Sequence, residues 1–134
     1  MTIRAVADTH AVIWYIFDDG RLSSTARWEM DTAAASGEQI AVSSISLIEM
    51  VYLVDKGRIA PAVFDGVLQA LDDPNPLLVE VFCDRSIAQA IRLVDRAQVP
   101  DLPDRIIAAT AAHLGVPLIS RDGKIRSSSV TTIW

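Results

Sequence analysis

The stretch Ile-Arg-Ala-Val-Ala-Asp-Thr-His, residues 3–10, decides the fold. Its first part, from Ile3 to Ala7, is short, apolar and bounded by polar residues, which suits a buried strand better than a helix. The segment from Thr9 to Phe17 is too long and continuous to be a turn. We therefore predict a strand, an acid and a helix. Asp8 then lies beyond the carboxyl end of the strand, where open α/β sheets bind ligands.

Downstream of this unit, apolar periodicity and breaker residues predict an alternation of helices and strands. Strands that alternate with helices indicate an α/β fold with a parallel sheet flanked by helices. No linker is long enough to divide the 134 residues, so we expect one domain over 1–134. The expected helices cover 25–36, 44–54, 62–71, 84–96 and 104–114, and the expected strands cover 40–43, 77–82, 116–120 and 130–134.

Composition narrows the class of protein. About half of the chain is hydrophobic (51%), which argues against disorder. The net charge of −5 counts against a protein that coats nucleic acid non-specifically, but not against a metal site. No signal peptide is visible and no apolar run approaches the ~20 residues of a membrane span, so we expect a cytoplasmic protein without membrane contact. The single cysteine, Cys83, ends an apolar run and is expected to be a buried, inert thiol.

Four acids stand apart from the rest because each opens or closes an apolar element. One follows the first strand, one lies in the first turn of the expected helix 44–54, one begins the helix 104–114, and one follows the strand 116–120. In a parallel sheet, strand ends and the following helix starts share one edge, so the four carboxylates should converge on one cleft. These acids are Asp8, Glu49, Asp104 and Asp122.

Each acid also has a purely structural interpretation. Residues 46–49 match a capping box, Asp8 is able to cap the first helix, and Asp104 offsets a helix dipole. Asp122 belongs to an Asp-Gly pair, which is common in turns. The structural interpretation is less convincing for all four acids together than for each acid alone. Four like charges at one edge would raise one another's pKa unless a cation lies among them.

A cluster of carboxylates without a cysteine or a histidine pair favours Mg²⁺ or Mn²⁺. Such an ion lowers the pKa of a bound water, stabilises charge on a phosphoryl oxygen and holds the leaving group. The ion, rather than the net charge of the protein, would attract the phosphate. The acids therefore favour phosphodiester hydrolysis.

At this point five segments together resemble the PIN domain and, more narrowly, the VapC toxins of bacterial type II toxin–antitoxin pairs. The resemblance covers nearly the whole chain. The segment around Asp104 and its spacing to Asp122 are the most specific parts. The segments are ADTHAVIW (7–14), SSISLIEM (43–50), PDRIIAATA (103–111), LISRD (118–122) and VTTIW (130–134).

The resemblance implies a Mg²⁺-dependent endoribonuclease that cuts structured or messenger RNA. It implies a three-layer α/β/α fold with a small central parallel sheet, often as a homodimer. It also implies a small VapB-like antitoxin whose tail lies across the active-site groove. Carried over by position, the four acids would be the catalytic, metal-binding carboxylates. Ser120 would support them as a hydroxyl at the strand end, and Thr9 would help to place Asp8.

Other polar residues near these motifs have two interpretations each. Asp101 is a helix N-cap, which we favour, or a competing ligand. His10 is a base or ligand, or else a structural side chain, which we favour. Arg105 and Arg121 pair with acids of the site or contact RNA or antitoxin. Lys124 lies with Arg121 on a solvated face or on a phosphate-contacting patch.

Three alternatives compete with this interpretation. A receiver domain and a haloacid-type phosphatase both use an Asp after the first strand. The phosphatase needs a second Asp where His10 stands, and the receiver needs a lysine better placed than Lys124. A catalytically silent PIN-like binding module would be favoured if one of the four acids were missing, and none is.

Trp14, Tyr15 and Phe17 are able to stack bases, although their spacing favours a core or a dimer face.

Overall fold

The computed structural model describes residues 2–134 and contains a five-stranded sheet in the order β3-β2-β1-β4-β5. All four strand pairings are parallel. The strands are β1 (Ile3–Ala7), β2 (Gln39–Ser43), β3 (Leu78–Val81), β4 (Leu118–Ile119) and β5 (Thr132–Ile133).

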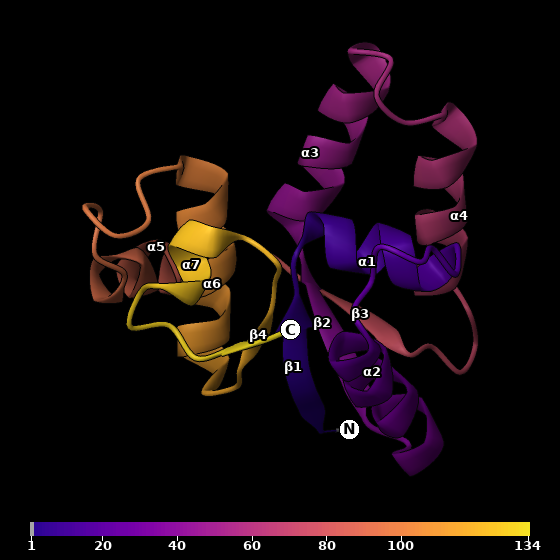
Figure 1. Ribbon diagram of the computed structural model, residues 1–134, viewed down its shortest axis with the longest axis horizontal. Coiled ribbons are helices and arrows are strands. Elements are labelled where there is room, and N and C mark those ends of the chain that lie inside the picture. Colours follow the sequence, from indigo (N-terminus) through magenta and orange to yellow (C-terminus); the bar gives the residue numbers. More distant parts are fainter. Residues whose placement is uncertain (1) are drawn as a thin grey trace.

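Helices cover both faces of this sheet, which confirms the predicted three-layer α/β/α architecture. In Figure 1, α5, α6 and α7 lie on one side of the sheet and α1, α2 and α4 on the other, with α3 rising above its edge. Within residues 2–134, no helix is long and apolar enough to cross a membrane. The helices are α1 (Thr9–Ile16), α2 (Ser24–Ser36), α3 (Ser44–Asp55), α4 (Pro61–Leu71), α5 (Arg85–Ala90), the 3-10 turn η1 (Ile91–Leu93), α6 (Leu102–Leu114) and α7 (Gly123–Arg126).

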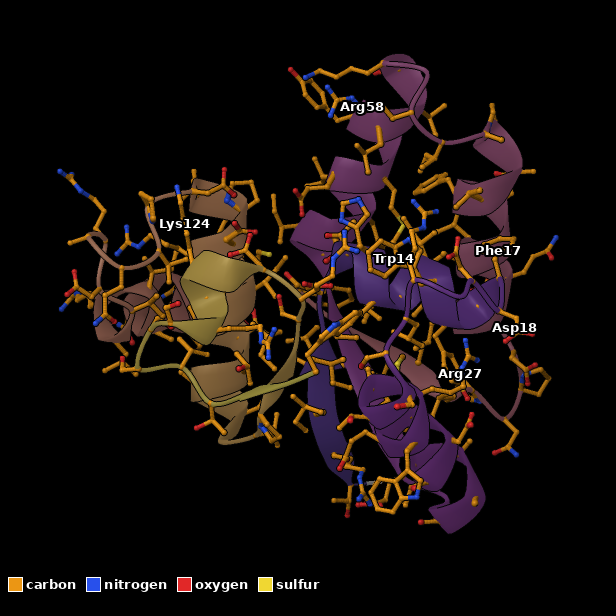
Figure 2. All side chains as sticks on the ribbon, viewed as in Figure 1. Trp14, Phe17, Asp18, Arg27, Arg58 and Lys124 are labelled. Carbon is orange, nitrogen blue, oxygen red and sulfur yellow. The ribbon has the colours of Figure 1, made fainter. Side chains whose placement is uncertain are left out.

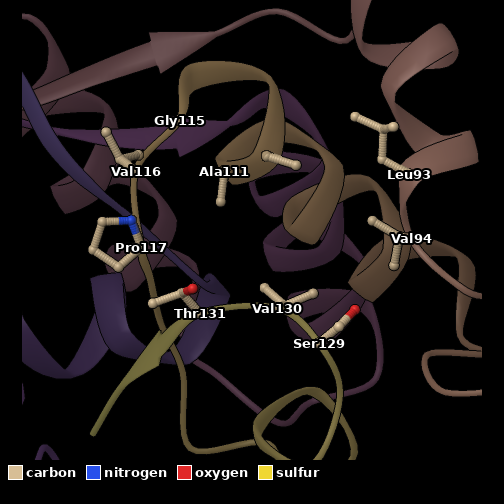
Figure 3. A pocket seen from close by; sticks show the side chains of 10 residues that line it. Leu93, Val94, Ala111, Gly115, Val116, Pro117, Ser129, Val130 and Thr131 are labelled. Carbon is tan, nitrogen blue, oxygen red and sulfur yellow. The ribbon is translucent and has the colours of Figure 1, made fainter.

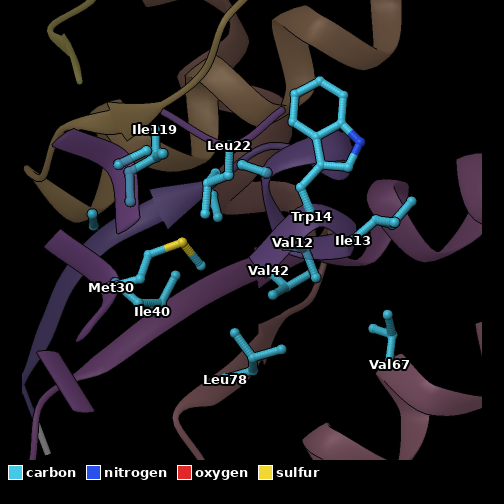
Figure 4. Close-up of a cluster of buried hydrophobic side chains, with 14 of the residues drawn as sticks. Val12, Ile13, Trp14, Leu22, Met30, Ile40, Val42, Val67, Leu78 and Ile119 are labelled. Carbon is cyan, nitrogen blue, oxygen red and sulfur yellow. The ribbon is translucent and has the colours of Figure 1, made fainter. Parts of the chain in front are cut away.

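The sheet separates two hydrophobic cores, and its strands alternate between them because successive side chains point to opposite faces. Ala5 and Ala7 of β1 join the core under α1, α2 and α4, whereas Val6 joins the core under α6. Figure 4 shows part of the first core, including Val12, Met30 and Ile119. In β4, Ile119 joins the first core and Leu118 the second. Burial on both faces explains why the strands read as continuous apolar runs.

The turn after α1 directs the chain toward α2. Asp18 adopts the left-handed conformation there, with φ of 52°, which Asp tolerates better than most residues. Its carboxylate pairs with Arg27 Nη1 at 2.8 Å, so the turn is tied to α2 (Figure 2). The turn thereby returns the chain so that α2 packs against the face of the sheet that α1 covers.

Some predicted elements were too long. The two strands at the C-terminal side of the sheet are two residues each, because β5 pairs only with β4 along Leu118 and Ile119. The predicted helix 84–96 ends at Ala90 and continues as η1. Arg105 Nη2 donates to the carbonyls of Ile91 and Val94, at the two ends of this turn, at 3.2 Å and 3.1 Å.

The prediction of a buried thiol was wrong, because Cys83 is exposed. The strand β3 is the edge strand of the sheet and ends at Val81, two residues earlier than the apolar run suggested. The chain leaves the sheet at Phe82, whose side chain is 68% exposed. Phe82 and Cys83 therefore face solvent although both are apolar.

Leu118→Ala should lower the free energy of unfolding by about 2–5 kcal/mol, because Leu118 is fully buried beside β1. Leu93→Ala is the matched control, since Leu93 is 71% exposed, and should stay within about 0.5 kcal/mol of the wild type. Urea unfolding followed by circular dichroism measures both. Equal losses in the two variants would contradict the assignment of the second core.

Candidate active site

A pocket of about 340 Å³ lies beyond the carboxyl ends of β1 and β4, at the edge that the sequence predicted. All four predicted acids line it, together with Asp101. The parallel sheet thus brings together carboxylates that are far apart in the sequence. The full lining is Asp8, Thr9, His10, Trp14, Glu49, Asp101, Asp104, Ile107, Arg121 and Asp122.

Asp8 is fixed at the start of α1. Its Oδ1 accepts a hydrogen bond from Ala11 N at 2.9 Å, as a helix N-cap does. Burial raises the pKa of the Asp8 carboxyl, while the hydroxyl of Ser120 donates to it and acts in the opposite direction. Ser120 is fully buried, directly follows β4 and is not among the residues that line the pocket.

Glu49 reaches the pocket from the second turn of α3, not from the first turn as predicted. The helix begins directly after β2 with Ser43 as N-cap, whose Oγ accepts from Ile45 N at 3.2 Å, so residues 46–49 do not form a capping box. Thr9 Oγ1 donates to Glu49 Oε1 at 2.7 Å and lies 3.0 Å from Ser46 Oγ. Thr9 therefore orients Glu49 rather than Asp8, because its side chain crosses from α1 to α3. Burial raises the pKa of the Glu49 carboxyl.

Two acids come from the start of α6. Asp101 is the N-cap, as favoured from the sequence, and accepts from Asp104 N at 3.1 Å. It also lines the pocket. Burial raises the pKa of the Asp104 carboxyl to about 7, and the negative charges of Asp101, Asp122 and Glu49 add to this shift.

Asp122 is the N-cap of α7, a short helix at the position for which the sequence also allowed an Asp-Gly turn. Its Oδ1 accepts from Lys124 N and Ile125 N, each at 3.0 Å. Its own N–H donates to Ser120 Oγ at 3.1 Å. The same serine thus contacts Asp8 and the segment that carries Asp122.

The three basic residues predicted to contact RNA or antitoxin lie in different places in the structure. Arg121 lines the pocket. Arg105 is not among the lining residues, and its guanidinium donates to the carbonyls at the end of η1, so it connects α6 to that turn. Lys124 is exposed on α7 and is likewise outside the lining (Figure 2). Trp14, which the sequence favoured as core, is buried and also lines the pocket.

The donor set fits a hard dication by its chemistry, since carboxylate oxygens are the ligands that Mg²⁺ and Mn²⁺ prefer. The charge repulsion that raises the pKa of Asp104 is what such an ion would relieve. As the side chains stand, no group of three or more His, Cys, Asp or Glu residues within 2–134 is arranged to hold a metal ion. The acids would have to turn toward a common centre to bind one.

A second hollow, of about 350 Å³, lies near the end of α6 and the segment that precedes β4 (Figure 3). Its lining includes Val116 and Pro117, which come before β4 and so lie at the opposite edge of the sheet from the acids. No ionisable side chain lines it. The acidic pocket is therefore the better candidate for chemistry.

The parallel strands bring acids to one end of the sheet, and helices cover both of its faces. The protein is therefore a three-layer α/β/α protein with a carboxylate-lined pocket. The sequence matches the PIN domain over residues 5–128, which is most of the chain. The chain therefore belongs to the PIN domain family. This membership removes the receiver domain and the haloacid-type phosphatase as alternatives.

Known proteins of similar sequence and structure agree with this assignment. The chain is 28% identical over 130 residues to the ribonuclease VapC22 of Mycobacterium tuberculosis, and the match covers 95% of each protein. Its fold resembles that of VapBC2 from Rickettsia felis bound to a DNA fragment from their promoter, with a TM-score of 0.70, 16% identity and 97% of each chain covered.

Two further structures share the fold. A toxin–antitoxin complex from Klebsiella pneumoniae has a TM-score of 0.62 and 23% identity, and the match covers 92% of this chain and 91% of that one. FitAcB from Neisseria gonorrhoeae has a TM-score of 0.56 and 20% identity, with 96% and 95% covered. The likeness at these identities concerns the fold.

The raised pKa of Asp104 predicts a pH dependence of stability in metal-free protein. The folded protein keeps the Asp104 proton up to pH about 7, whereas the unfolded chain releases it near pH ~4. Since the folded state binds more protons in this window, the free energy of unfolding should fall as the pH rises through it. Urea unfolding in EDTA between pH 4.5 and 8 measures the slope.

Asp104→Asn should reduce this slope, because it removes the group whose pKa is about 7, while Asp8 and Glu49 still contribute through their own raised pKa values. Asp65→Asn is the matched control, since Asp65 is exposed on α4 and outside the pocket. An unchanged slope in Asp104→Asn would contradict the electrostatic description of the pocket.

Proposed function

We propose that this chain is a Mg²⁺-dependent endoribonuclease, with Mn²⁺ as a substitute ion, and the toxin of a toxin–antitoxin pair. The observation that carries the proposal is the gathering of Asp8, Glu49, Asp104 and Asp122 around one pocket. The sequence similarity to the ribonuclease VapC22 supports RNA as the substrate class.

In this proposal, the four acids hold the ion through their carboxylate oxygens. The ion would supply an activated water and stabilise charge on the phosphoryl oxygen during hydrolysis. Ser120 keeps Asp8 in place through its hydroxyl, and Thr9 keeps Glu49 in place through Oγ1. Asp101 holds the first turn of α6 so that Asp104 faces the pocket.

An antitoxin and a second copy of the chain are the proposed protein partners, and the cytoplasm is the proposed location. The antitoxin is supported by the fold shared with the toxin–antitoxin complex from Klebsiella pneumoniae. The outer face of α3 exposes Ile48, Val51 and Tyr52 by 61%, 43% and 61%, and a cluster of this kind is typical of a surface that a partner covers.

The enzymatic part of the proposal predicts cleavage of RNA by purified, antitoxin-free protein in Mg²⁺ and no cleavage in EDTA. Asp8→Asn and Asp104→Asn should each lower the rate by about 100-fold or more, because each removes a charged ligand. Cleavage of an end-labelled RNA, followed on a denaturing gel, measures the rates.

Asp65→Asn is the control for this experiment and should cleave as the wild type does. Folding of each variant is checked by circular dichroism before the assay. Wild-type rates in Asp8→Asn or Asp104→Asn would refute the assigned site. No cleavage by the folded wild type would favour the catalytically silent binding module.

The toxin part of the proposal predicts growth arrest when the chain is expressed in a bacterium. Co-expression of the small gene next to its own should relieve the arrest, whereas Asp104→Asn should grow normally without it. Colony counts after induction measure the effect. Normal growth at high expression of the wild type would count against a toxin.

A further inference from the structure

Arg121 lies over an aromatic ring at the rim of the acidic pocket. Its guanidinium carbon is 4.5 Å from the centroid of the Trp14 ring, a distance that gives a cation–π interaction. Arg121 is exposed, although the residues on either side of it are held by the hydrogen bond between Asp122 N and Ser120 Oγ. The backbone is therefore fixed while the guanidinium stays accessible.

Charge alone would place the Arg121 guanidinium against one of the carboxylates rather than over the Trp14 ring. Five acids line the same pocket, and Asp122 is the next residue in the chain. Yet the ion pairs formed within residues 2–134 do not include Arg121. The ring therefore holds the guanidinium at a distance from the carboxylates.

Trp14 is itself firmly held, which makes it a rigid support. Its side chain is 3% exposed and stands at the margin of the core cluster (Figure 4). The ring centroids of His10 and Trp134 lie 5.4 Å and 6.0 Å from it. Arg21 also lies over this ring, at 5.1 Å, but its charge is paired with Asp19 at 2.8 Å.

We propose that Trp14 is a positioning residue that holds Arg121 ready to bind a phosphate of the RNA strand beside the carboxylates. The inference rests on the proposed nuclease function and adds to it a phosphate-binding residue and its support. A guanidinium binds phosphate oxygens in a bidentate manner. At this rim it offsets the negative charge of the pocket for an incoming polyanion. If it paired with the acids instead, it would occupy the oxygens that the ion needs.

Binding of an RNA that cannot be cleaved tests this role without catalysis. A 2′-O-methyl oligoribonucleotide is titrated by fluorescence anisotropy at several salt concentrations. Arg121→Gln should weaken binding about tenfold and lower the slope of log Kd against log[salt] by about 0.7, the value expected for one contact to a single strand. Arg121→Lys should keep the slope, because it keeps the charge.

Arg92→Gln is the matched control. It makes the same change of charge at an exposed residue of η1 that does not line the pocket, and should leave affinity and slope unchanged. An unchanged slope in Arg121→Gln, or an equal loss in Arg92→Gln, would overturn the inference.

The support role of Trp14 is tested by a series of variants and a double-mutant cycle. Trp14→Phe should weaken binding less than Trp14→Leu, because Phe keeps an aromatic face. Urea unfolding identifies conditions in which all variants are folded. Trp14→Leu combined with Arg121→Gln should bind no more weakly than Arg121→Gln alone, since the ring acts through the guanidinium. Additive losses would overturn the positioning role.

The binding assay also separates this inference from the proposed function. A wild type that cleaves RNA, while Arg121→Gln keeps its salt slope, contradicts the inference alone. A wild type that binds the oligonucleotide with the expected slopes but does not cleave RNA in Mg²⁺ contradicts the nuclease proposal alone. A wild type that cleaves RNA but does not bind the oligonucleotide contradicts the inference alone, and one that neither binds nor cleaves contradicts both.

Discussion

Electrostatic repulsion among carboxylates at one edge of a parallel sheet is the constraint on which the site depends. The direction of the strands brings Asp8 and Asp122 to that edge, and α3 and α6 add Glu49 and Asp104. Burying Asp104 and bringing these charges together both cost free energy, and the two effects, burial first, raise the pKa of Asp104 to about 7. The fold tolerates this cost because two hydrophobic cores, one on each face of the sheet, hold the elements in place.

Local hydrogen bonds fix the directions in which the acids point. Asp8, Asp101 and Asp122 each cap a helix, and Glu49 accepts from Thr9. Capping satisfies backbone N–H groups that would otherwise lack partners, and it suits an anion at the positive end of a helix. The same bonds turn carboxylate oxygens toward the helices. This agrees with the finding that no three acidic, histidine or cysteine side chains in residues 2–134 are arranged around a common centre.

The sequence predicted the order of elements apart from η1 and α7, and also the gathering of the acids, because burial on both faces gives strands a simple apolar signature. The sequence predicted the ends and the burial of an element less well where that element has few neighbours in the sheet. The edge position of β3 exposes Phe82 and Cys83 although both are apolar, and a short pairing limits β5 to two residues. Periodicity also cannot show that Arg105 donates to the carbonyls of Ile91 and Val94, since these two bonds join α6 to a separate segment.

The site shows the same division between local and long-range information. Asp101 was predicted as a cap from its local context, and it is one. The position of Trp14 at the pocket was missed, because its partner Arg121 is more than a hundred residues away and no local pattern connects them. The bond from Thr9 to Glu49 depends likewise on how α1 and α3 approach each other.

Three helices begin at the pocket, and each begins with an acid that lines it. Filling the pocket with a cation would therefore act on the first turns of α1, α6 and α7 at once. If the pocket holds the proposed cation, fraying of these turns and release of the ion would be coupled, and cutting by a protease at these turns would depend on whether the pocket is occupied.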